Sequence, residues 1–189
     1  PNGDFRKFRV RSLVGLIPLF AVERLEEEWI EPFDEFTRSL SWFIKHKSNL
    51  TGEVVHRVER DGSAMHLLTI VNEHQLCALL GRMWDQTEFL SDHGIRSLSK
   101  AHLDRPLEFD GRVVGYEPAE AASKIKGGNS NWRGPIWFPT CFLLIESLRK
   151  LGMAYGSTLH FSTGNGDRKQ MTAQQIASEL ANRLIRIFT

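Results

Sequence analysis

The 189-residue sequence has little charge imbalance, and this absence excludes several classes of protein. Its 24 basic residues are matched by 23 acidic ones, which leaves a formal net charge of +1. No overall positive field would therefore attract nucleic acid or an anionic membrane. An apolar run at residues 13–22 is too short to cross a bilayer and contains Pro18. We therefore expect that the protein binds neither nucleic acid nor a membrane.

The sequence has two cysteines, Cys77 and Cys141, and each lies in an apolar helical pattern where a buried, reduced thiol is expected. A disulfide between them remains an open alternative. No cysteine and histidine spacing is typical of a zinc site, and no phosphate-binding loop, dinucleotide fingerprint or serine nucleophile elbow occurs. The first residues also do not show a positively charged leader followed by a small-residue cleavage site. We expect a cytoplasmic protein without a cofactor.

The most unusual stretch, residues 126–140, is rich in glycine, proline, asparagine and tryptophan. Glycine permits positive φ angles and proline prevents regular pairing, so an irregular but rigid loop is expected. Flat aromatic rings beside amide and guanidinium donors suit a sugar, which has apolar C–H faces and hydroxyl edges. In the alternative interpretation the loop is a buried connector, with tryptophans filling the core and Arg133 capping carbonyl groups.

Apolar periodicity predicts helices over most of the remaining chain. The predicted segments are Ser12–Leu25, kinked at Pro18; Pro32–His46; a helix capped by Asn72 with Gln75; Phe138–Leu151, stopped by Gly152; and a last helix capped by Thr172 with Gln175.

A short β-hairpin is predicted between residues 54–58 and 65–71, because Asp61-Gly62 separates two apolar runs. Residues 89–118 show no convincing period, and a long irregular segment of this kind is usually functional or disordered. Its aromatic and aliphatic residues argue against disorder. The patterns together predict a mainly α fold with long ordered loops.

Two carboxylates, Glu117 and Glu120, precede the tryptophan-rich stretch. In an apolar pocket such groups have a raised pKa and serve as general acids. The alternative is that they cap helices or form ion pairs with Arg96 or Arg133. Arg96 also has two interpretations, since it either binds a hydroxyl or carboxylate of a ligand or locks its loop to a buried acid.

The segment Asn131-Trp-Arg-Gly-Pro-Ile-Trp137, followed by an amphipathic helix, resembles the signature of glycoside hydrolase family 63. That family includes processing α-glucosidases and mannosylglycerate-hydrolase-like enzymes. Further blocks at residues 11–20, 89–99, 116–120 and 127–132 resemble successive blocks of its large bacterial members. The similarity covers nearly the whole chain in order.

The resemblance implies that the chain is the C-terminal part of an (α/α)6 toroid, with an active site formed by loops at one end. It also implies an inverting mechanism, in which one carboxylic acid protonates the glycosidic oxygen and one carboxylate activates water. The blocks that hold the general acid and base in the family lie outside the matched region. We therefore expect residues 1–189 to be one segment of a longer polypeptide, truncated at both ends and inactive alone.

The resemblance also implies a set of sugar-binding positions within the chain. In relatives an aromatic-Trp pair lines the subsite of the sugar being cleaved, whereas this sequence has Asn131-Trp132. The expected substrate-binding residues are Gly94, Arg96, Ser97, Asn131, Trp132 and Arg133. The expected partners are an oligosaccharide or glycoside and the rest of the same polypeptide. The alternative function is a non-catalytic carbohydrate-binding or helical interaction domain.

Overall fold

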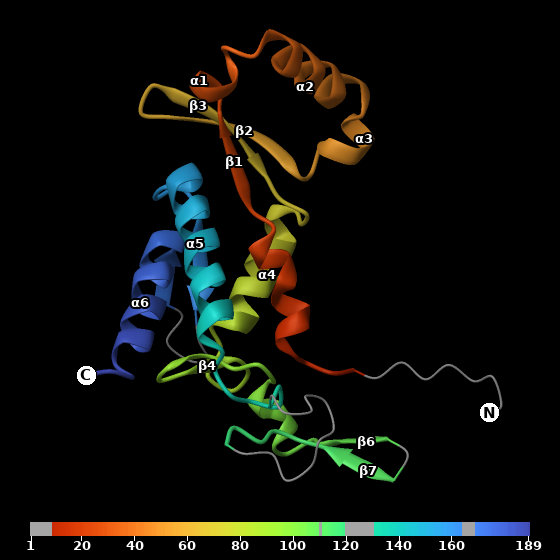
Figure 1. The fold of residues 1–189 in the computed structure, drawn as a ribbon, viewed down its shortest axis with the longest axis vertical. Coiled ribbons are helices and arrows are strands. Elements are labelled where there is room, and N and C mark those ends of the chain that lie inside the picture. Colours follow the sequence, from red (N-terminus) through yellow and green to blue (C-terminus); the bar gives the residue numbers. More distant parts are fainter. Residues whose placement is uncertain (1–8, 110, 120–130, 164–168) are drawn as a thin grey trace, which may run out of the picture.

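The computed structural model describes residues 9–109, 111–119, 131–163 and 169–189. Helices and small antiparallel sheets alternate along these residues, in a mixed α/β arrangement (Figure 1). The expectation of a mainly α fold, and of part of an (α/α)6 toroid, is therefore wrong. Segments that were expected to be helical or irregular pair instead as short strands, and no ring of paired helices is formed within the described ranges.

The N-terminal part of the chain forms a three-stranded antiparallel sheet in the order β1-β3-β2. Its strands are β1 (Glu23–Glu26), β2 (Val55–Arg60) and β3 (Ser63–Leu68). The predicted hairpin is confirmed: Asp61 and Gly62 have φ angles of 53° and 82°, which suit a tight turn between antiparallel strands. Helices α1 (Glu27–Ile30), α2 (Asp34–His46) and α3 (Ser48–Thr51) connect β1 to β2.

The predicted kinked helix over residues 12–25 is replaced by two elements. Residues Leu13–Phe20 form a 3-10 helix, η1, and β1 follows it. Pro18 has no amide hydrogen to donate within a helix, which explains why a longer α-helix is not continued here. Residues 23–26 then pair with residues 65–68, so a long-range sheet contact overrides the local helical pattern.

The rest of the chain forms a helical body. It contains α4 (Glu73–Met83), α5 (Phe138–Tyr155) and α6 (Ala173–Ile185), with a hairpin of β8 (His160–Thr163) and β9 (Lys169–Thr172) between α5 and α6. Two smaller hairpins, β4 (Leu90–Ser91) with β5 (Gly94–Ile95) and β6 (Leu107–Phe109) with β7 (Arg112–Val114), flank η2 (Lys100–His102) in the segment expected to be irregular.

The predicted helix starts are confirmed by their caps. Asn72 and Gln75 form a reciprocal capping box at α4, and Thr172 and Gln175 form one at α6. Helix α5 continues past the predicted stop at Gly152 and ends at Gly156, whose φ is 56°. Gly152 instead allows close packing of α6, because a Cβ there would lie 3.1 Å from the side chain of Gln174.

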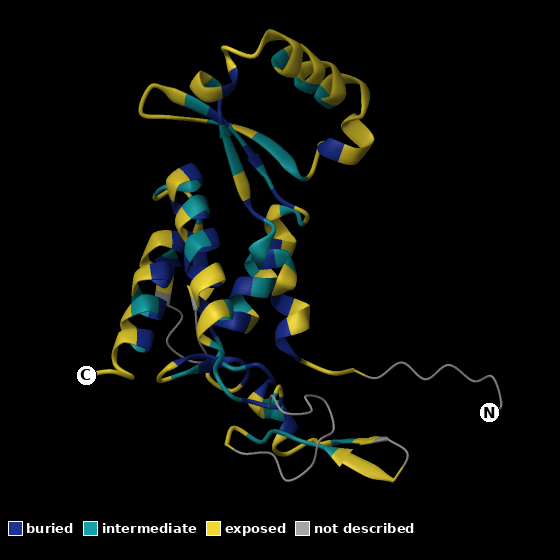
Figure 2. Ribbon diagram, in the orientation of Figure 1, coloured by how far each residue is buried: buried dark blue, intermediate teal, exposed yellow. Residues whose placement is uncertain are grey.

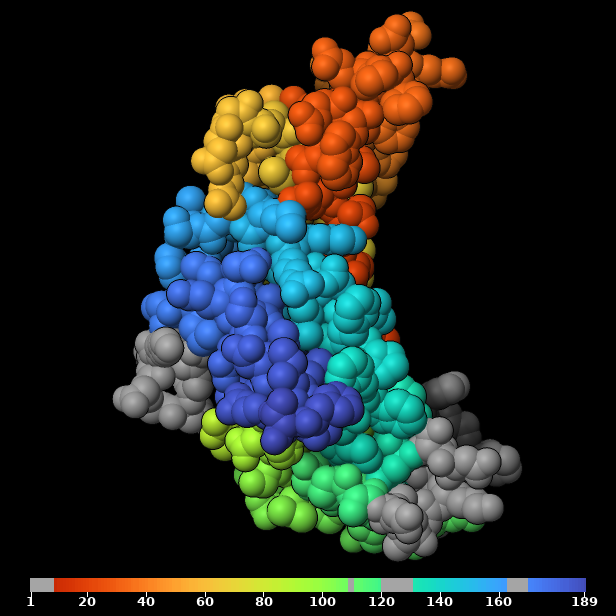
Figure 3. All heavy atoms as spheres, turned by 60° about the vertical axis from the view of Figure 1, so that its left-hand side comes forward, coloured from red at the N-terminus to blue at the C-terminus, as the bar shows by residue number. Residues whose placement is uncertain are grey.

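The core lies where η1, α4, α5 and α6 meet, whereas α2 and α3 are largely exposed (Figure 2). Its centre is formed by aliphatic side chains with at most 2% exposure, namely Leu16, Leu19, Leu76, Leu80, Leu144, Leu148, Leu151, Ile176 and Leu180. The three-stranded sheet β1-β3-β2 lies next to the end of α5 (Figure 3). Arg60 connects the two parts by donating hydrogen bonds to the carbonyl oxygens of Gly152 and Met153.

Candidate functional site

The loop at residues 131–137 is held in place by the side chain of Asn131. Its amide nitrogen donates hydrogen bonds to the carbonyl oxygens of Glu117 and Ala119, at 2.7 and 2.5 Å, and its amide oxygen accepts one from the backbone N–H of Arg133 at 2.9 Å. Asparagine is suited to this role because one side chain both donates to and accepts from the backbone. Asn131 therefore connects residues 117–119 to the loop at residues 131–137.

Arg133 is fully buried, with 0% of its side chain exposed, and its Nη2 lies 2.8 Å from Oε2 of Glu117. The backbone N–H of Glu117 also donates to the carbonyl oxygen of Arg133. A buried guanidinium requires such pairing because its desolvation is costly. The structure thus places Arg133 beneath the loop as an anchor, in agreement with the interpretation of Glu117 as its ion-pair partner. Glu120 lies outside the described residues.

Gly94, Arg96 and Ser97 lie next to this loop. The backbone N–H of Ser97 donates to the carbonyl oxygen of Pro135, and its hydroxyl accepts from the N–H of Gly134 at 3.0 Å. Gly94 has a φ of 138°, and a Cβ there would lie 2.9 Å from the side chain of Ile136. Ser97 and Gly94 are both buried, so they set the position of the loop backbone.

Arg96 is held by groups of its own surroundings. Its Nε donates to the hydroxyl of Tyr116 at 3.0 Å, and its guanidinium also bonds to the carbonyl oxygens of Gln86 and Leu90. Tyr116 in turn packs against Gly134, whose φ is 141° and whose missing Cβ would lie 2.6 Å from the tyrosine ring. Arg96 thus locks its loop, but through a tyrosine hydroxyl and carbonyl oxygens in place of the expected buried acid.

The two tryptophans of the loop form a stacked pair. Their ring centroids are 4.6 Å apart and their planes differ by 11°. The indole N–H of Trp137 donates to the carbonyl oxygen of Asn131, which fixes the ring of Trp137. Trp132 is 36% exposed and is the more exposed ring of the pair, since Trp137 is half-buried.

Trp132 borders a hollow of about 410 Å³. Most of its wall is apolar, with three hydroxyl groups, and it is lined by Ser12, Leu13, Val14, Ile17, Phe20, Ser97, Trp132 and Thr140. Thr140 donates its hydroxyl hydrogen to the carbonyl oxygen of Trp137, so its oxygen is available as an acceptor. Ligand pockets commonly combine such an apolar wall with a few polar groups.

The contribution of η1 to this hollow was missed at the level of sequence. A 3-10 helix has three residues per turn, so every third side chain lies on the same face. Leu13, Leu16 and Leu19 are buried, while the adjacent positions Val14 and Ile17 are exposed and line the hollow. The signal was present as an apolar run with a period of three, which an α-helical interpretation concealed.

Among the described residues no group of histidine, cysteine, aspartate or glutamate side chains is arranged to hold a metal ion. Over the same residues, none of the helices has the length and apolar character needed to span a membrane. Both cysteines are free thiols, and Cys141 is buried beside Ile95.

Comparison with known proteins finds a similar protein in yeast. The chain is 40% identical over 192 residues to the uncharacterized protein YMR196W of Saccharomyces cerevisiae (strain ATCC 204508 / S288c), and the alignment covers 98% of the chain. The chain spans 18% of the length of that relative. No family model matches the chain, and no solved structure matches it.

Proposed function

We propose that the chain provides a sugar-binding wall of a glycoside hydrolase that acts on α-glucosidic or related bonds. The observation that carries the proposal is the stacked pair of Trp132 and Trp137 at the edge of the apolar hollow. The resemblance of residues 131–137 to the signature of glycoside hydrolase family 63 supports the same function. The wall would belong to a longer polypeptide, since the chain spans 18% of the length of its yeast relative.

The geometry supports a role for Trp132 in sugar stacking. An indole ring offers a large, flat apolar surface, and the C–H face of a pyranose is apolar in the same way. The ring is backed by Trp137, which is itself fixed by a hydrogen bond to the carbonyl oxygen of Asn131. A ring held in position before binding loses little conformational freedom when the sugar arrives. Hydroxyl groups of Ser12 and Thr140 would contact the edge of the sugar.

The two carboxyl groups of an inverting mechanism would come from other parts of the longer polypeptide. One must protonate the leaving oxygen and the other must activate a water molecule. The carboxylate of Glu117 is occupied by the buried Arg133, which leaves it poorly placed for either task. The free state of both cysteines suits the reducing cytoplasm, where we place the enzyme.

The proposal is tested by assaying the full-length protein against aryl α-glucosides. Trp132→Ala should lower kcat/KM strongly, while Trp29→Ala should leave it unchanged, since Trp29 is 58% exposed in α1 and lies outside the site. The enzymatic role would be contradicted if the intact protein hydrolysed no glycoside. The Trp132 variant must still fold for the comparison to be valid.

A second candidate function is a non-catalytic carbohydrate-binding or interaction domain. The strongly apolar wall favours it, because Val14 and Ile17 remain 67% and 48% exposed at the hollow and are suited to contact another apolar surface. A sugar that binds without being hydrolysed would support this candidate. If no sugar binds, and substitution of Ile17 abolishes a contact with another protein, the interaction domain alone would be supported.

A further inference from the structure

Helix α2 has an apolar side on which the phenylalanines are exposed, while Leu40 and Ile44 are half-buried. Apolar residues recur at spacings of three and four along one side of the helix, at Phe33, Phe36, Leu40, Phe43 and Ile44. No residue of α2 is buried, and Phe33, Phe36 and Phe43 are 63%, 47% and 44% exposed. An amphipathic helix of this kind normally buries its apolar stripe against another element.

The opposite side of the same helix is different in character. Trp42 is 54% exposed, but its ring stacks on His46 at a centroid distance of 4.8 Å. Arg38 and Lys45 are also exposed there. The stripe at Phe36 and Phe43 is therefore a specific feature of one side of α2.

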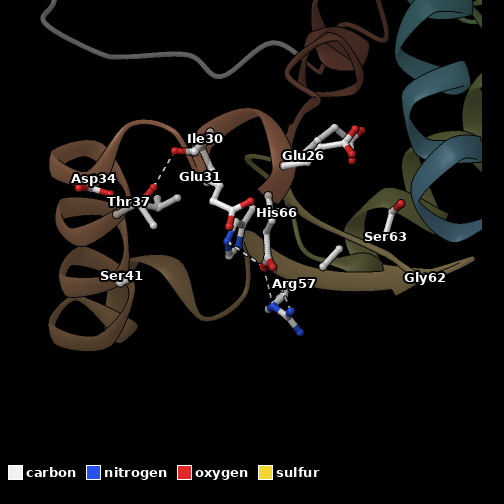
Figure 4. A pocket seen from close by; sticks show the side chains of 14 residues that line it. Glu26, Ile30, Glu31, Asp34, Thr37, Ser41, Arg57, Gly62, Ser63 and His66 are labelled. Carbon is white, nitrogen blue, oxygen red and sulfur yellow. Dashed lines mark hydrogen bonds and ion pairs between the residues drawn. The ribbon is translucent and has the colours of Figure 1, made fainter.

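A hollow of about 790 Å³ lies beside the stripe, between α1, α2 and the β2-β3 hairpin (Figure 4). Leu40 belongs to both the stripe and the wall of the hollow, and Thr37 ties α2 to α1 through a hydrogen bond to the carbonyl oxygen of Ile30 at 2.8 Å. The hollow and the stripe thus form one continuous surface around α2.

Negative charge dominates the wall of this hollow. Five carboxylates line it, from Glu26, Glu27, Glu28, Glu31 and Asp34. Arg57 supplies the single guanidinium of the wall. It forms ion pairs with Glu27 and with Glu59, which lies outside the hollow. In the described part of the chain no cation forms an ion pair with Glu28, Glu31 or Asp34.

We propose that the apolar side of α2 and the acidic hollow together bind a basic amphipathic helix from another region of the same long polypeptide. The stripe favours an apolar partner, and the neighbouring carboxylates favour lysine or arginine beside it. A helix fits because α2 has 13 residues, a length of roughly 20 Å, over which the side chains of two helices can interlock. The chain matches only 18% of the yeast relative, so a polypeptide of that kind has ample length to supply the helix.

The test is site-specific photo-crosslinking in the full-length protein. A benzoylphenylalanine is placed at position 36, with position 42 as the matched control, because both are exposed aromatic positions on different sides of α2. We expect position 36 to form an intramolecular cross-link to a segment that alternates basic and apolar residues with helical spacing. Position 42 should not form that link.

A second variant tests the contribution of charge. Glu28→Lys combined with Glu31→Lys should abolish or sharply reduce the cross-link from position 36, whereas Glu108→Lys, on an exposed strand elsewhere, should not. The proposal is overturned if position 36 links to a second copy of the protein, to an acidic or purely polar segment, or to nothing. It is also overturned if positions 36 and 42 give the same products. None of these outcomes depends on whether the protein binds or cleaves a sugar.

Discussion

The guanidinium of Arg133, which is completely buried, lies 2.8 Å from the carboxylate of Glu117, whose side chain is 32% exposed. This ion pair, with the hydrogen bonds of Asn131, fixes the backbone on either side of Trp132. The arginine next to the exposed tryptophan is thus a structural anchor of the loop.

Neutralising Glu117 should destabilise the fold. Glu117→Gln leaves a buried guanidinium with a weaker partner, and we expect a loss of about 1–2 kcal/mol in the free energy of unfolding, reduced by the solvent access of Glu117. Denaturant unfolding of the full-length protein measures this loss. Glu108→Gln is the control, since Glu108 is exposed. Equal effects of the two substitutions would show that the ion pair contributes nothing.

Gly134 should not tolerate a side chain. An alanine there would adopt a φ of 141° and place its Cβ 2.6 Å from the ring of Tyr116, so Gly134→Ala should cost about 2 kcal/mol or more. Gly111→Ala separates the two causes, because Gly111 has a φ of 70° and open space around it, and should cost about 1–2 kcal/mol. Thermal unfolding of both variants checks the order. Equal or reversed costs would mean that Tyr116 moves aside freely.

Much of the local structure follows from the sequence, because its causes are local. Asn72 and Thr172 cap helices through side chains that reach only three residues ahead, and Asp61-Gly62 closes a hairpin by backbone preference alone. The structure of residues 23–26 does not follow from their local sequence. Their pattern is helical, and their strand exists only because residues 65–68 pair with them across the chain.

The candidate site could be predicted only as a set of residues. The structure brings the blocks that hold Gly94, Arg96, Ser97 and residues 131–137 together. The orientation of each side chain could not be predicted, because the burial of Arg133 depends on its pairing with Glu117, and that of Arg96 on Tyr116. To predict that η1 lines the hollow, one would have to know that residues 13–20 form a 3-10 helix.

Cys141 should be protected from alkylation and should make stability depend on alkaline pH. Burial raises the pKa of its thiol from 9.0 to about 11. Because the folded-state pKa is higher than that of the unfolded chain, this stabilisation is complete below pH 9 and is lost as the pH rises through about 11. Iodoacetamide labelling at pH 8 with mass spectrometry should modify Cys77 much faster than Cys141, which is buried. Similar rates would show that the core around α5 opens readily.

The central claim is that Trp132 binds sugar through its exposed ring face. It is tested most directly by calorimetric titration of a thio-linked α-glucoside, which resists hydrolysis, into the full-length protein and its Trp132→Phe and Trp132→Ala variants. We predict that the alanine variant binds about tenfold more weakly or worse, a change of about 1.4 kcal/mol, while the phenylalanine variant retains most of the affinity. Unchanged affinity in Trp132→Ala, with its fold intact, would contradict the claim.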